Sequence, residues 1–344
     1  MQPATAARDN VPFHRLDGGA TSRGDGPPHV PDAAARRLLP QRVRLLLALS
    51  RPRQWTKSVL VLAAPAAAGT LNQAGAAGRT AATVLAFTLA SVAVYAANDV
   101  RDAAADRAHP HKRLRPVASG ALSATTALVW AGTCALVSLT AAAVIGSSTF
   151  VVVVCYLALS GGYALWLKNM PVLDVVAVAA GFVLRALAGA TANHLVPSDW
   201  FLLVSLFGAL YLVLGKRASE ATHPTSTTGG STAGASSGPA TPELPSRAVL
   251  SQYPTAWLQQ MLTVSLAGAL LSYAMWAFQT VGTDVFKPLL ALSVVPFIVA
   301  LMRYGLLLAG GQGERPEHVV TSDRMLMLAG LAWCALVTGG LYAA

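Results

Sequence analysis

The sequence contains few charged residues for its length. Asp, Glu, Lys and Arg together make up 12% of its 344 residues, whereas hydrophobic residues make up 54%. A soluble domain carries roughly 25% charged residues, so this chain lacks the charge to cover a water-exposed surface of its size. Mean hydropathy is +0.52. The composition therefore excludes an ordinary soluble globular protein and predicts a protein that contacts the lipid bilayer.

Cysteine and acidic residues are also scarce. Three cysteines are scattered through apolar runs, which excludes a disulfide framework and a cysteine metal cluster. Only 15 residues are Asp or Glu, against 25 Lys or Arg, so the formal net charge is +10. In a lipid-facing chain an excess of basic residues indicates binding to anionic lipid headgroups or to phosphorylated substrates. The sequence has no zinc-finger spacing and no basic patch interleaved with aromatics, so we expect no nucleic-acid partner.

Long apolar runs fill most of the chain after residue 50. A membrane-spanning helix needs about 20 mostly apolar residues, and nine runs qualify once the uncharged stretch 116–167 is divided at Gly146-Ser147-Ser148. We therefore predict an all-α polytopic membrane protein with about nine transmembrane helices. They are expected at Lys57–Gly75, Thr80–Ala97, Ala121–Ile145, Ser148–Leu167, Val172–Ala192, Trp200–Gly215, Trp257–Thr280, Phe286–Ala309 and Met325–Ala343.

Two segments lack such runs. Residues 1–50 contain no apolar core of the kind that a signal peptide needs, and we predict a disordered basic tail there. Residues 222–246 are dominated by Ser, Thr, Gly and Pro and are expected to form a flexible loop. The catalytic transmembrane domain is then expected over residues 51–344. Its many Gly and Ala residues permit close helix packing and leave a homo-oligomer open.

The basic residues predict the orientation in the membrane. With nine spans and a cytoplasmic N-terminus, 22 of the 25 Lys and Arg residues fall on the inner side. Arg79 and Lys287 fall on the outer side, and Arg185 falls within a span. Lys and Arg are enriched in cytoplasmic loops. We therefore expect the N-terminus and the loops after the second, fourth, sixth and eighth spans to face the cytoplasm.

An acidic cluster follows the second predicted span. On a continuous helix Asn98, Asp99, Asp102 and Asp106 fall within about 100° of one another. Carboxylates this close repel one another unless a cation neutralises them, and Mg²⁺ takes one or two carboxylates together with substrate phosphate. We predict that these four residues hold Mg²⁺ and that the three aspartates are catalytic. A solvated acidic face paired with neighbouring arginines is the alternative.

A basic segment follows directly, with Lys112, Arg113 and Arg115 ahead of Pro116. A diphosphate needs a metal that bridges its oxygens and Lys and Arg side chains that neutralise the remaining charge. The two clusters together predict a diphosphate-binding site at the inner end of the second span. A basic loop that only sets the topology is the alternative for each residue.

The two clusters resemble a known family. Asn-Asp-x-x-Asp-x-x-x-Asp after the second span, followed by Lys-Arg-x-Arg-Pro, is similar to the UbiA superfamily of intramembrane prenyltransferases. Further segments narrow the resemblance to the branch that transfers phosphoribosyl to polyprenyl (decaprenyl) phosphate, which begins lipid-linked arabinose synthesis for bacterial cell walls. These segments are Arg51-Pro-Arg-Gln-Trp-Thr-Lys57, Pro171-Val-Leu-Asp174, Gly181-Phe-Val-Leu-Arg185-Ala-Leu-Ala-Gly189 and Gly215-Lys216-Arg217-x-x-Glu220.

The resemblance implies a UbiA-like bundle around a central cavity that opens to the cytoplasmic side of a bacterial inner membrane. It implies Mg²⁺ as cofactor, with phosphoribosyl diphosphate and polyprenyl phosphate as substrates. Aromatic prenyltransferases of the superfamily carry a second Asp-rich motif after the sixth span, where this chain has Lys216, Arg217 and Glu220. Cations in place of metal-binding acids imply a donor with a phosphate beyond its diphosphate. A membrane stop signal is the alternative for the two cations.

Arg185 lies about 14 residues into the fifth predicted span. An arginine at the centre of a membrane costs roughly 2.5–3.5 kcal/mol, so it should face a polar cavity or an acid. Asp174 is 11 residues away on the same helix, about 16 Å along the axis, which is too far for an ion pair. We predict that Arg185 contacts a phosphate; a bond to backbone carbonyls is the alternative.

The resemblance and the predicted topology together give two sets of binding residues on the inner face. The donor-binding residues are Lys112, Arg113, Arg115, Lys168, Arg185, Lys216, Arg217, Glu220 and Tyr253. The lipid-phosphate-binding residues are Arg51, Arg53, Gln54, Lys57 and Tyr95.

Two other functions remain open. A prenyltransferase that moves an isoprenyl chain to an aromatic acceptor shares the fold and the first motif, but the Lys-Arg pair in place of the second acidic motif weighs against it. A transporter also places polar residues within spans. It needs no metal-spaced acidic cluster, however, and the sequence shows no repeated half of the kind found in transporters.

Overall fold

The fold is that of a computed structural model, which describes residues 41–222, 249–279, 288–310 and 322–342. All of these belong to one compact unit, Gln41–Ala344. Residues 1–40 of the predicted tail lie outside the described residues. So do residues 223–246 of the predicted loop at 222–246. Three basic residues used to predict the orientation, Arg247, Lys287 and Arg315, also lie outside them.

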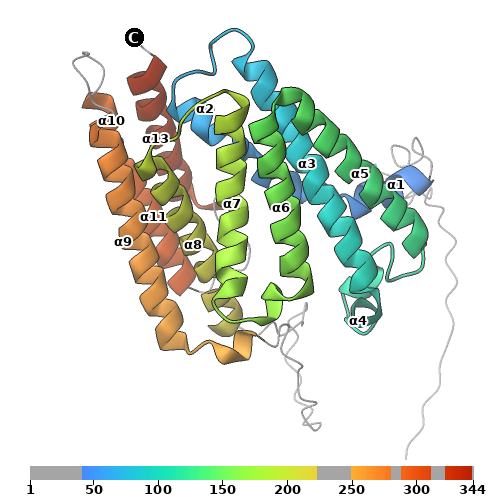
Figure 1. Cartoon of the computed structure of the whole chain (residues 1–344). Helices are drawn as coiled ribbons and strands as arrows, with labels where there is room; N and C mark the ends of the chain where they lie inside the picture. The colour runs from blue at the N-terminus through green and yellow to red at the C-terminus, as the bar shows by residue number, and fades with distance from the viewer. Residues whose placement is uncertain (1–40, 223–248, 280–287, 311–321, 343–344) are drawn as a thin grey trace, which may run out of the picture. The chain divides into compact units, whose positions relative to one another are not determined.

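The described residues form helices joined by turns, and no β-strand occurs among them (Figure 1). Within the part of the chain that the structure describes, eight helices are long and apolar enough to cross a membrane, which confirms an all-α polytopic membrane fold. They are α3 (Ala76–Arg101), α5 (Ala124–Ile145), α6 (Ser147–Leu165), α7 (Leu173–Ala192), α8 (Asp199–Thr222), α9 (Thr255–Gln279), the consecutive α10 (Pro288–Leu292) and α11 (Val294–Ala309), and α13 (Arg324–Tyr342).

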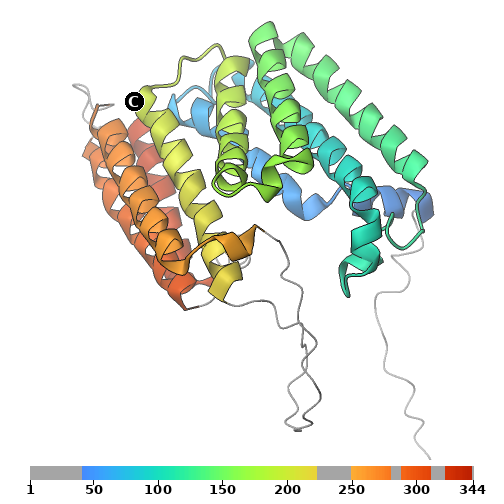
Figure 2. The ribbon, with the colours of Figure 1, turned by 60° about the horizontal axis from the view of Figure 1, so that its bottom comes forward.

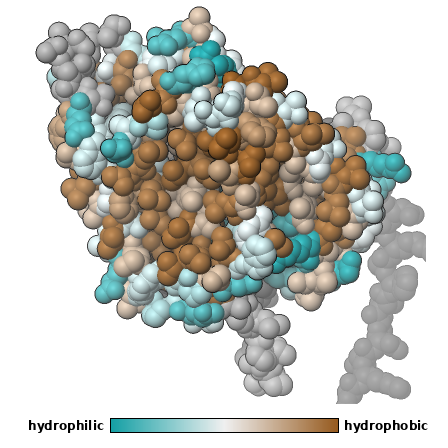
Figure 3. All heavy atoms as spheres, viewed as in Figure 1, coloured by the Kyte–Doolittle hydropathy of each residue, from teal (hydrophilic) through white to brown (hydrophobic). Residues whose placement is uncertain are grey.

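One face of the bundle carries a broad hydrophobic band (Figure 3). Figure 3 shows hydrophobic residues across the middle of the helices, with hydrophilic residues gathered above and below. Large apolar side chains such as Val144, Leu271 and Leu331 are more than 60% exposed. Exposure of such side chains to water is unfavourable, so this band is the surface that contacts the acyl chains of the bilayer.

Residues Lys57–Gly75, where the first span was predicted, do not form one long helix. This accounts for the eight long helices among the described residues where nine were expected. This part of the chain forms a 3₁₀ helix, η2 (Pro52–Leu62), and a short helix, α2 (Ala63–Ala67). Both contain a proline, which has no N–H to donate to a helix. The segment packs against α3 and α7. A Cβ at Gly189 of α7 would lie 1.8 Å from the carbonyl oxygen of Val61, so this close approach requires glycine.

Helix boundaries follow local signals in the sequence. The side chain of Ser123 accepts the backbone N–H of Thr126 at 3.1 Å and begins α5, as expected of a serine N-cap. Asp323 accepts the N–H of Leu326 at 2.8 Å and an N–H from Arg303 at 2.7 Å. These bonds, the one from Arg303 first, hold the pKa of Asp323 below its usual range. The predicted division at Gly146 is confirmed, because α5 ends and α6 begins on either side of it.

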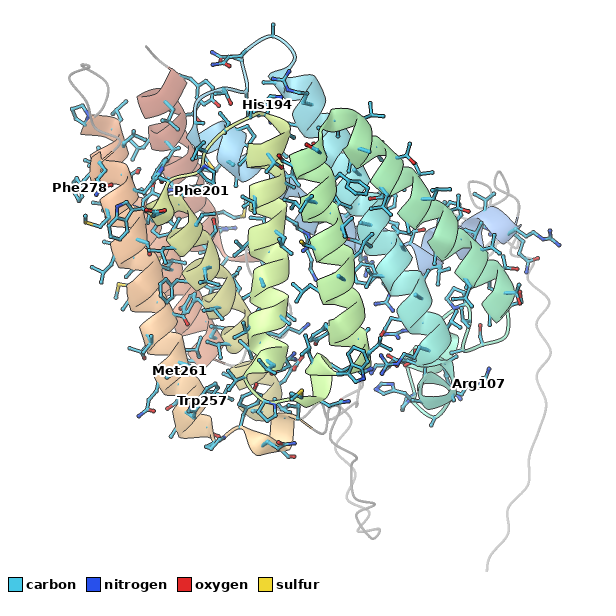
Figure 4. All side chains as sticks on the ribbon, viewed as in Figure 1. Arg107, His194, Phe201, Trp257, Met261 and Phe278 are labelled. Carbon is cyan, nitrogen blue, oxygen red and sulfur yellow. The ribbon has the colours of Figure 1, made fainter. Side chains whose placement is uncertain are left out.

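Neighbouring helices bring several chain segments to one end of the bundle. The pairs α3–α5, α6–α7, α7–α8 and α8–α9 pack side by side. The end of α3, the short helix α4 (Ala103–Arg107) and the start of α9 lie at this end, which Figure 2 brings forward. Arg107 and Trp257 mark it in Figure 4, whereas His194 and Phe278 lie at the opposite end. We refer to it as the α4 end.

Candidate active site at the α4 end

The acidic cluster lies where α3 passes into α4. α3 ends at Arg101, and Asp102 stands between the two helices at φ −87° and ψ 3°, so the continuous helix of the prediction is interrupted there. Asp99 and Asp106 are buried, while Asn98 and Asp102 are half-buried. The Asn98 amide donates to Asp102 Oδ2 at 3.0 Å. The four predicted residues therefore lie within nine consecutive positions but in two different environments.

Two arginines neutralise the buried aspartates. Arg115 Nη1 lies 3.2 Å from Asp99 Oδ1 and 2.6 Å from Asp106 Oδ2, and so bridges the two carboxylates. The guanidinium of Arg51 also pairs with Asp99. A buried carboxylate is stable only when it is paired and hydrogen-bonded. These contacts bring together one predicted donor-binding residue, one predicted lipid-phosphate-binding residue and two predicted metal ligands.

The third aspartate pairs with a lysine from a different segment. Lys168 lies in the single turn η4 (Leu167–Asn169) between α6 and α7, and its Nζ is 3.2 Å from Asp102 Oδ1. Arg101 donates to the carbonyl of Leu165 at 3.5 Å across the same junction. The predicted donor-binding residue Lys168 thus reaches the acidic cluster, although 66 positions separate it from Asp102.

The carboxylates are divided between these cations. Within the described ranges, no three Asp, Glu, His or Cys side chains gather closely enough to hold a metal ion as the side chains stand. Asp102 turns toward Lys168, whereas Asp99 and Asp106 share one nitrogen of Arg115. The predicted ligand set therefore takes the form of two carboxylates around a shared cation, with an amide and a carboxylate beside them.

The residues predicted to bind the lipid phosphate lie along the turn into η2. Arg51 adopts a left-handed conformation with φ 49° and ψ 66°, and its guanidinium lies over the ring of Tyr95 at 5.2 Å. Arg53 is exposed, and Gln54 and Lys57 are half-buried. The backbone N–H of Gln54 donates to the carbonyl of Arg51 at 2.8 Å. Arg51 thus contacts both Tyr95 and Asp99 of the acidic cluster.

The basic segment after α4 forms the short turn η3 (Lys112–Leu114). His109 Nδ1 accepts the backbone N–H of Lys112 at 3.4 Å. Burial and then the nearby Lys112 lower the pKa of His109, so its imidazole is a neutral acceptor near pH 7. Arg113 is exposed and donates to the carbonyl of Pro110 at 3.2 Å. Arg115, the last predicted cation of this segment, bonds to the acidic cluster.

A second charged cluster lies at the α4 end around Asp174, near the start of α7. This carboxylate is fully buried, and Nε and Nη2 of Arg217 each lie 3.1 Å from its Oδ2. Arg217 Nη1 also donates to Glu220 at 2.9 Å. Lys216 is exposed, with its Nζ 4.0 Å from the same glutamate. Tyr253 donates its hydroxyl hydrogen to Asp174. Two predicted donor-binding residues, Arg217 and Tyr253, thus contact an acid for which the sequence predicts no role, and Glu220 and Lys216 extend the cluster from Arg217.

Tyr253 fixes the start of α7 as well. Its hydroxyl oxygen accepts the backbone N–H of Val172 at 2.6 Å, and its ring stacks on Trp257 at 5.2 Å. Val172 has φ 68°, a strained conformation for a β-branched residue. Burial, followed by the hydrogen bond to Asp174, raises the pKa of Tyr253 to about 12. The phenol therefore stays protonated and acts as a donor at physiological pH.

Arg185 is buried inside the bundle among neutral partners. It donates to the carbonyl of Gly181 at 2.7 Å, to the hydroxyl of Tyr156 at 2.9 Å and to that of Ser91 at 3.2 Å. Its Nε has no hydrogen-bond partner among the described residues. Asp174 and Arg185 bond to different groups, in agreement with the separation expected from the sequence. Ser91 and Tyr156 were not predicted; as hydroxyl-bearing residues in apolar spans, they carried a weak signal.

The sequence profile of the UbiA prenyltransferase family matches residues 58–305. The chain belongs to the UbiA family. It is 36% identical to the decaprenyl-phosphate phosphoribosyltransferase of Mycobacterium tuberculosis over 291 residues, which is 83% of this chain and 91% of the relative. The enzyme of that name from Corynebacterium glutamicum is also 36% identical, over 85% of each chain.

Solved structures of UbiA proteins share the fold. A UbiA homologue from Archaeoglobus fulgidus bound to DMAPP and Mg²⁺ superposes with a TM-score of 0.60 and covers 86% of this chain and 97% of its own, at 17% identity. A digeranylgeranylglyceryl phosphate synthase superposes equally well, with a TM-score of 0.60 at 15% identity, over 88% of this chain and 99% of its own. The helical arrangement of this UbiA protein is thus that of intramembrane prenyltransferases.

Proposed function

We propose that this UbiA protein transfers the 5-phosphoribosyl group from phosphoribosyl diphosphate to polyprenyl phosphate, such as decaprenyl phosphate, and releases diphosphate. The observation that carries the proposal is the 36% identity to decaprenyl-phosphate phosphoribosyltransferase over 83% of this chain and 91% of the relative. The two charged clusters at the α4 end support the same assignment, because the donor carries a diphosphate and a separate 5-phosphate.

The two clusters divide the donor between them. The acidic cluster of Asp99, Asp102 and Asp106 is the first, and it would take the diphosphate. Its cations are Lys112, Arg113, Arg115 and Lys168. In the second, Lys216 and Arg217 would take the 5-phosphate, with Arg185 deeper in the bundle. Glu220 accepts from Arg217 and Tyr253 donates to Asp174, so these two would hold the cations and the ion pair in place around the donor. Arginine binds phosphate through paired N–H groups and lysine binds it as a point charge, so the two clusters suit a donor that is anionic at both ends.

The acidic cluster fits a hard divalent cation by its donor set. Asp99 and Asp106 present carboxylate oxygens to one shared cationic nitrogen, and hard cations such as Mg²⁺ prefer oxygen ligands of this type. Asp99 and Asp106 would hold the ion, with Asn98 and Asp102 as further candidate ligands. When bound, Mg²⁺ supplies positive charge to a leaving diphosphate. A UbiA homologue of the same fold is bound to Mg²⁺, which supports the use of a divalent cation by this protein.

In the proposed reaction an oxygen of the acceptor phosphate forms a bond to C1 of the ribose. The bond from C1 to the diphosphate oxygen breaks, and its electron pair leaves with the diphosphate. Arg115 and Lys168 are already placed against the acidic cluster, where that negative charge develops. Preorganised cations stabilise a developing charge without reorganisation. The acceptor phosphate is anionic near neutral pH, so no strong general base is needed, and in-line attack inverts C1 from α to β.

The acceptor phosphate would approach from the membrane along the turn into η2. Arg51, Arg53, Gln54, Lys57 and Tyr95 are the proposed contacts. Arg51 belongs to this set and also pairs with Asp99, so it joins the acceptor side of the site to the donor side. Such an arrangement brings the two anionic substrates to neighbouring cations and lowers the repulsion between them.

The protein is a multi-pass membrane protein, and we propose that it lies in the bacterial inner membrane with the α4 end facing the cytoplasm. Residues predicted on the inner side, including Arg51, Arg115, Lys168 and Arg217, take part in ion pairs of the two clusters. A cytoplasmic site has access to a soluble phosphorylated donor. A homo-oligomer stays a prediction from the frequent small residues.

A substrate-exchange assay tests the proposal against the other reaction of the family. Purified protein in detergent with Mg²⁺ receives either phosphoribosyl diphosphate with decaprenyl phosphate, or an isoprenyl diphosphate with an aromatic acid. We expect a lipid product from the first pair, lost on addition of EDTA and in Asp102→Ala. A product from the second pair alone would assign the protein to aromatic prenyl transfer instead.

A further inference from the structure

An apolar groove opens on the outside of the bundle beside the turn into η2. It has a volume of about 390 Å³ and lies between α1 (Gln41–Leu49), η2, α3 and α5. Leu85 is 61% exposed, Leu47 41% and Trp55 39%, so the groove lies open on the surface that contacts lipid. The residues that form most of its wall are Leu47, Trp55, Leu85, Thr88, Leu89 and Trp130.

The rim of this groove is built on Ser50. The indole N–H of Trp55 donates to the carbonyl of Ser50 at 2.9 Å, and the indole N–H of Trp130 donates to its hydroxyl at 3.2 Å. Ser50 is only 3% exposed, and both indoles are thereby fixed on one residue. Because the N–H group at the edge of each indole is bonded to Ser50, the flat apolar faces of the two rings are left as walls of the groove.

The next residue along the chain connects the groove to the reaction site. Arg51 adopts the left-handed conformation, which turns the chain sharply, and its guanidinium pairs with Asp99 on α3. The neighbouring residues Ser50 and Arg51 therefore face two sites: one holds the wall of an apolar groove and the other reaches the acidic cluster. Arg53, two residues further on, is exposed beside them.

We propose that this groove binds the isoprenoid chain of the acceptor lipid phosphate, an inference that rests on the proposed function. The groove follows α3 from Ala81 to Val92, about 16 Å along the helix axis. Val92 lies seven residues, or about 10 Å, before Asp99. A chain in this groove carries its phosphate toward Arg51 and Arg53. The charge at the rim is complementary to a phosphate, and the apolar wall to a hydrocarbon chain, so an amphiphilic anion fits both.

Blocking the groove tests the proposal by chain length. Leu85→Trp places a large ring in the groove, and Leu271→Trp on α9, at a site 67% exposed, is the matched control. We expect Leu85→Trp to raise KM for decaprenyl phosphate at least tenfold. Leu85 lies 14 residues, or about 21 Å along α3, before Asp99. The KM values for a polyprenyl phosphate whose chain is too short to reach Leu85, and for phosphoribosyl diphosphate, should therefore stay unchanged. An unchanged KM for decaprenyl phosphate, or an equal rise for the short-chain acceptor, would overturn the proposal.

Photolabelling of the unmodified protein tests it without any variant and without turnover. Decaprenyl phosphate that carries a diazirine on its chain is irradiated with the protein, and the labelled peptides are identified by mass spectrometry. We expect label on residues 81–92 and Trp130, displaced by decaprenyl phosphate but not by phosphatidylglycerol. Label elsewhere, or equal displacement by phosphatidylglycerol, would show a different site or an ordinary lipid groove. Because the readout is binding, it is independent of whether phosphoribosyl transfer is the reaction.

Discussion

Asp174 at the start of α7 and Arg217 near the end of α8 form a buried ion pair across 43 positions of the sequence. Their side chains are 0% and 4% exposed, and two guanidinium nitrogens lie 3.1 Å from one carboxylate oxygen. The pair ties two transmembrane helices together at the α4 end and compensates the charge of a predicted donor-binding arginine. Lys216, the neighbour of Arg217, is in contrast exposed.

Removing one member of this pair is expected to destabilise the fold. Asp174→Ala removes one of the two carboxylates that pair with the buried Arg217 and leaves Glu220 as the other. Breaking a buried ion pair costs up to about 3–5 kcal/mol. The thermal unfolding midpoint in detergent should fall clearly. The double variant Asp174→Leu/Arg217→Met removes both charges and should recover most of the stability while transfer stays lost. A single variant as stable as the unmodified protein would contradict the structural role of the pair.

Tyr253 is expected to contribute to the free energy of unfolding, and this contribution should be lost at alkaline pH. Its pKa is raised from 10 to about 12 in the fold, so the folded state keeps a proton that the unfolded state loses above pH 10. The contribution is therefore fully present below pH 10 and is lost as the pH rises toward 12.

The check is the unfolding midpoint of the unmodified protein and of Tyr253→Phe, measured from pH 7 to 12. The advantage of the unmodified protein should be constant up to about pH 9 and shrink between pH 10 and 12. Because the two proteins share every other tyrosine, those groups cancel in the difference. If the midpoint difference between the two proteins instead grows between pH 10 and 12, the raised pKa of Tyr253 and its hydrogen bond to Asp174 are contradicted.

Gly189 is expected to tolerate no side chain. A Cβ there would lie 1.8 Å from the carbonyl oxygen of Val61 and 2.9 Å from its carbonyl carbon. Backbone atoms cannot turn aside as a flexible side chain can, so Gly189→Ala must displace η2 from α7. We expect a marked loss of folded protein in detergent and of transfer activity. Gly208→Ala on α8, where a Cβ meets nothing within 4 Å, is the control and should behave as the unmodified protein.

Arg185 is expected to matter for activity more than for stability. Replacement by Met removes a buried cation whose partners are neutral, and Ser91 and Tyr156 remain bonded to each other at 2.9 Å. The unfolding midpoint of Arg185→Met should therefore stay close to that of the unmodified protein. Transfer should fall at least 100-fold, and Arg185→Lys should recover part of it because it keeps the charge. Full activity in Arg185→Met would limit the role of this residue to its structural bonds with Gly181, Ser91 and Tyr156.

Most of the fold could be predicted from hydropathy, because lipid forces each span into a long apolar helix. The division at Gly146 is an example, since an uncharged stretch too long for one membrane crossing must be divided into two helices. The segment after Arg51 was harder to predict. Its apolar content met the criterion for a span, but Pro52 and Pro65 together with its packing against Gly189 favour a 3₁₀ helix and a short α-helix.

The residue types of the site could also be predicted, but not their pairing. Asp99, Asp102 and Asp106 stood out because acids are rare in this chain, and the geometry of one helix excluded a pair between Asp174 and Arg185. The partner of each acid depends on how separate helices pack. Asp174 pairs with Arg217, and Asp102 with Lys168, and both contacts join segments that no local pattern relates.

The destination of the two ends of the donor tests the central claim most directly. Phosphoribosyl diphosphate labelled with ³²P either on the 5-phosphate or on the β-phosphate is incubated with the protein, decaprenyl phosphate and Mg²⁺, and lipid is then extracted. Phosphoribosyl transfer predicts that the 5-phosphate label enters the lipid phase while the β-phosphate label stays in water as diphosphate. If the 5-phosphate label also stays in water, phosphoribosyl transfer to lipid is not the reaction of this protein.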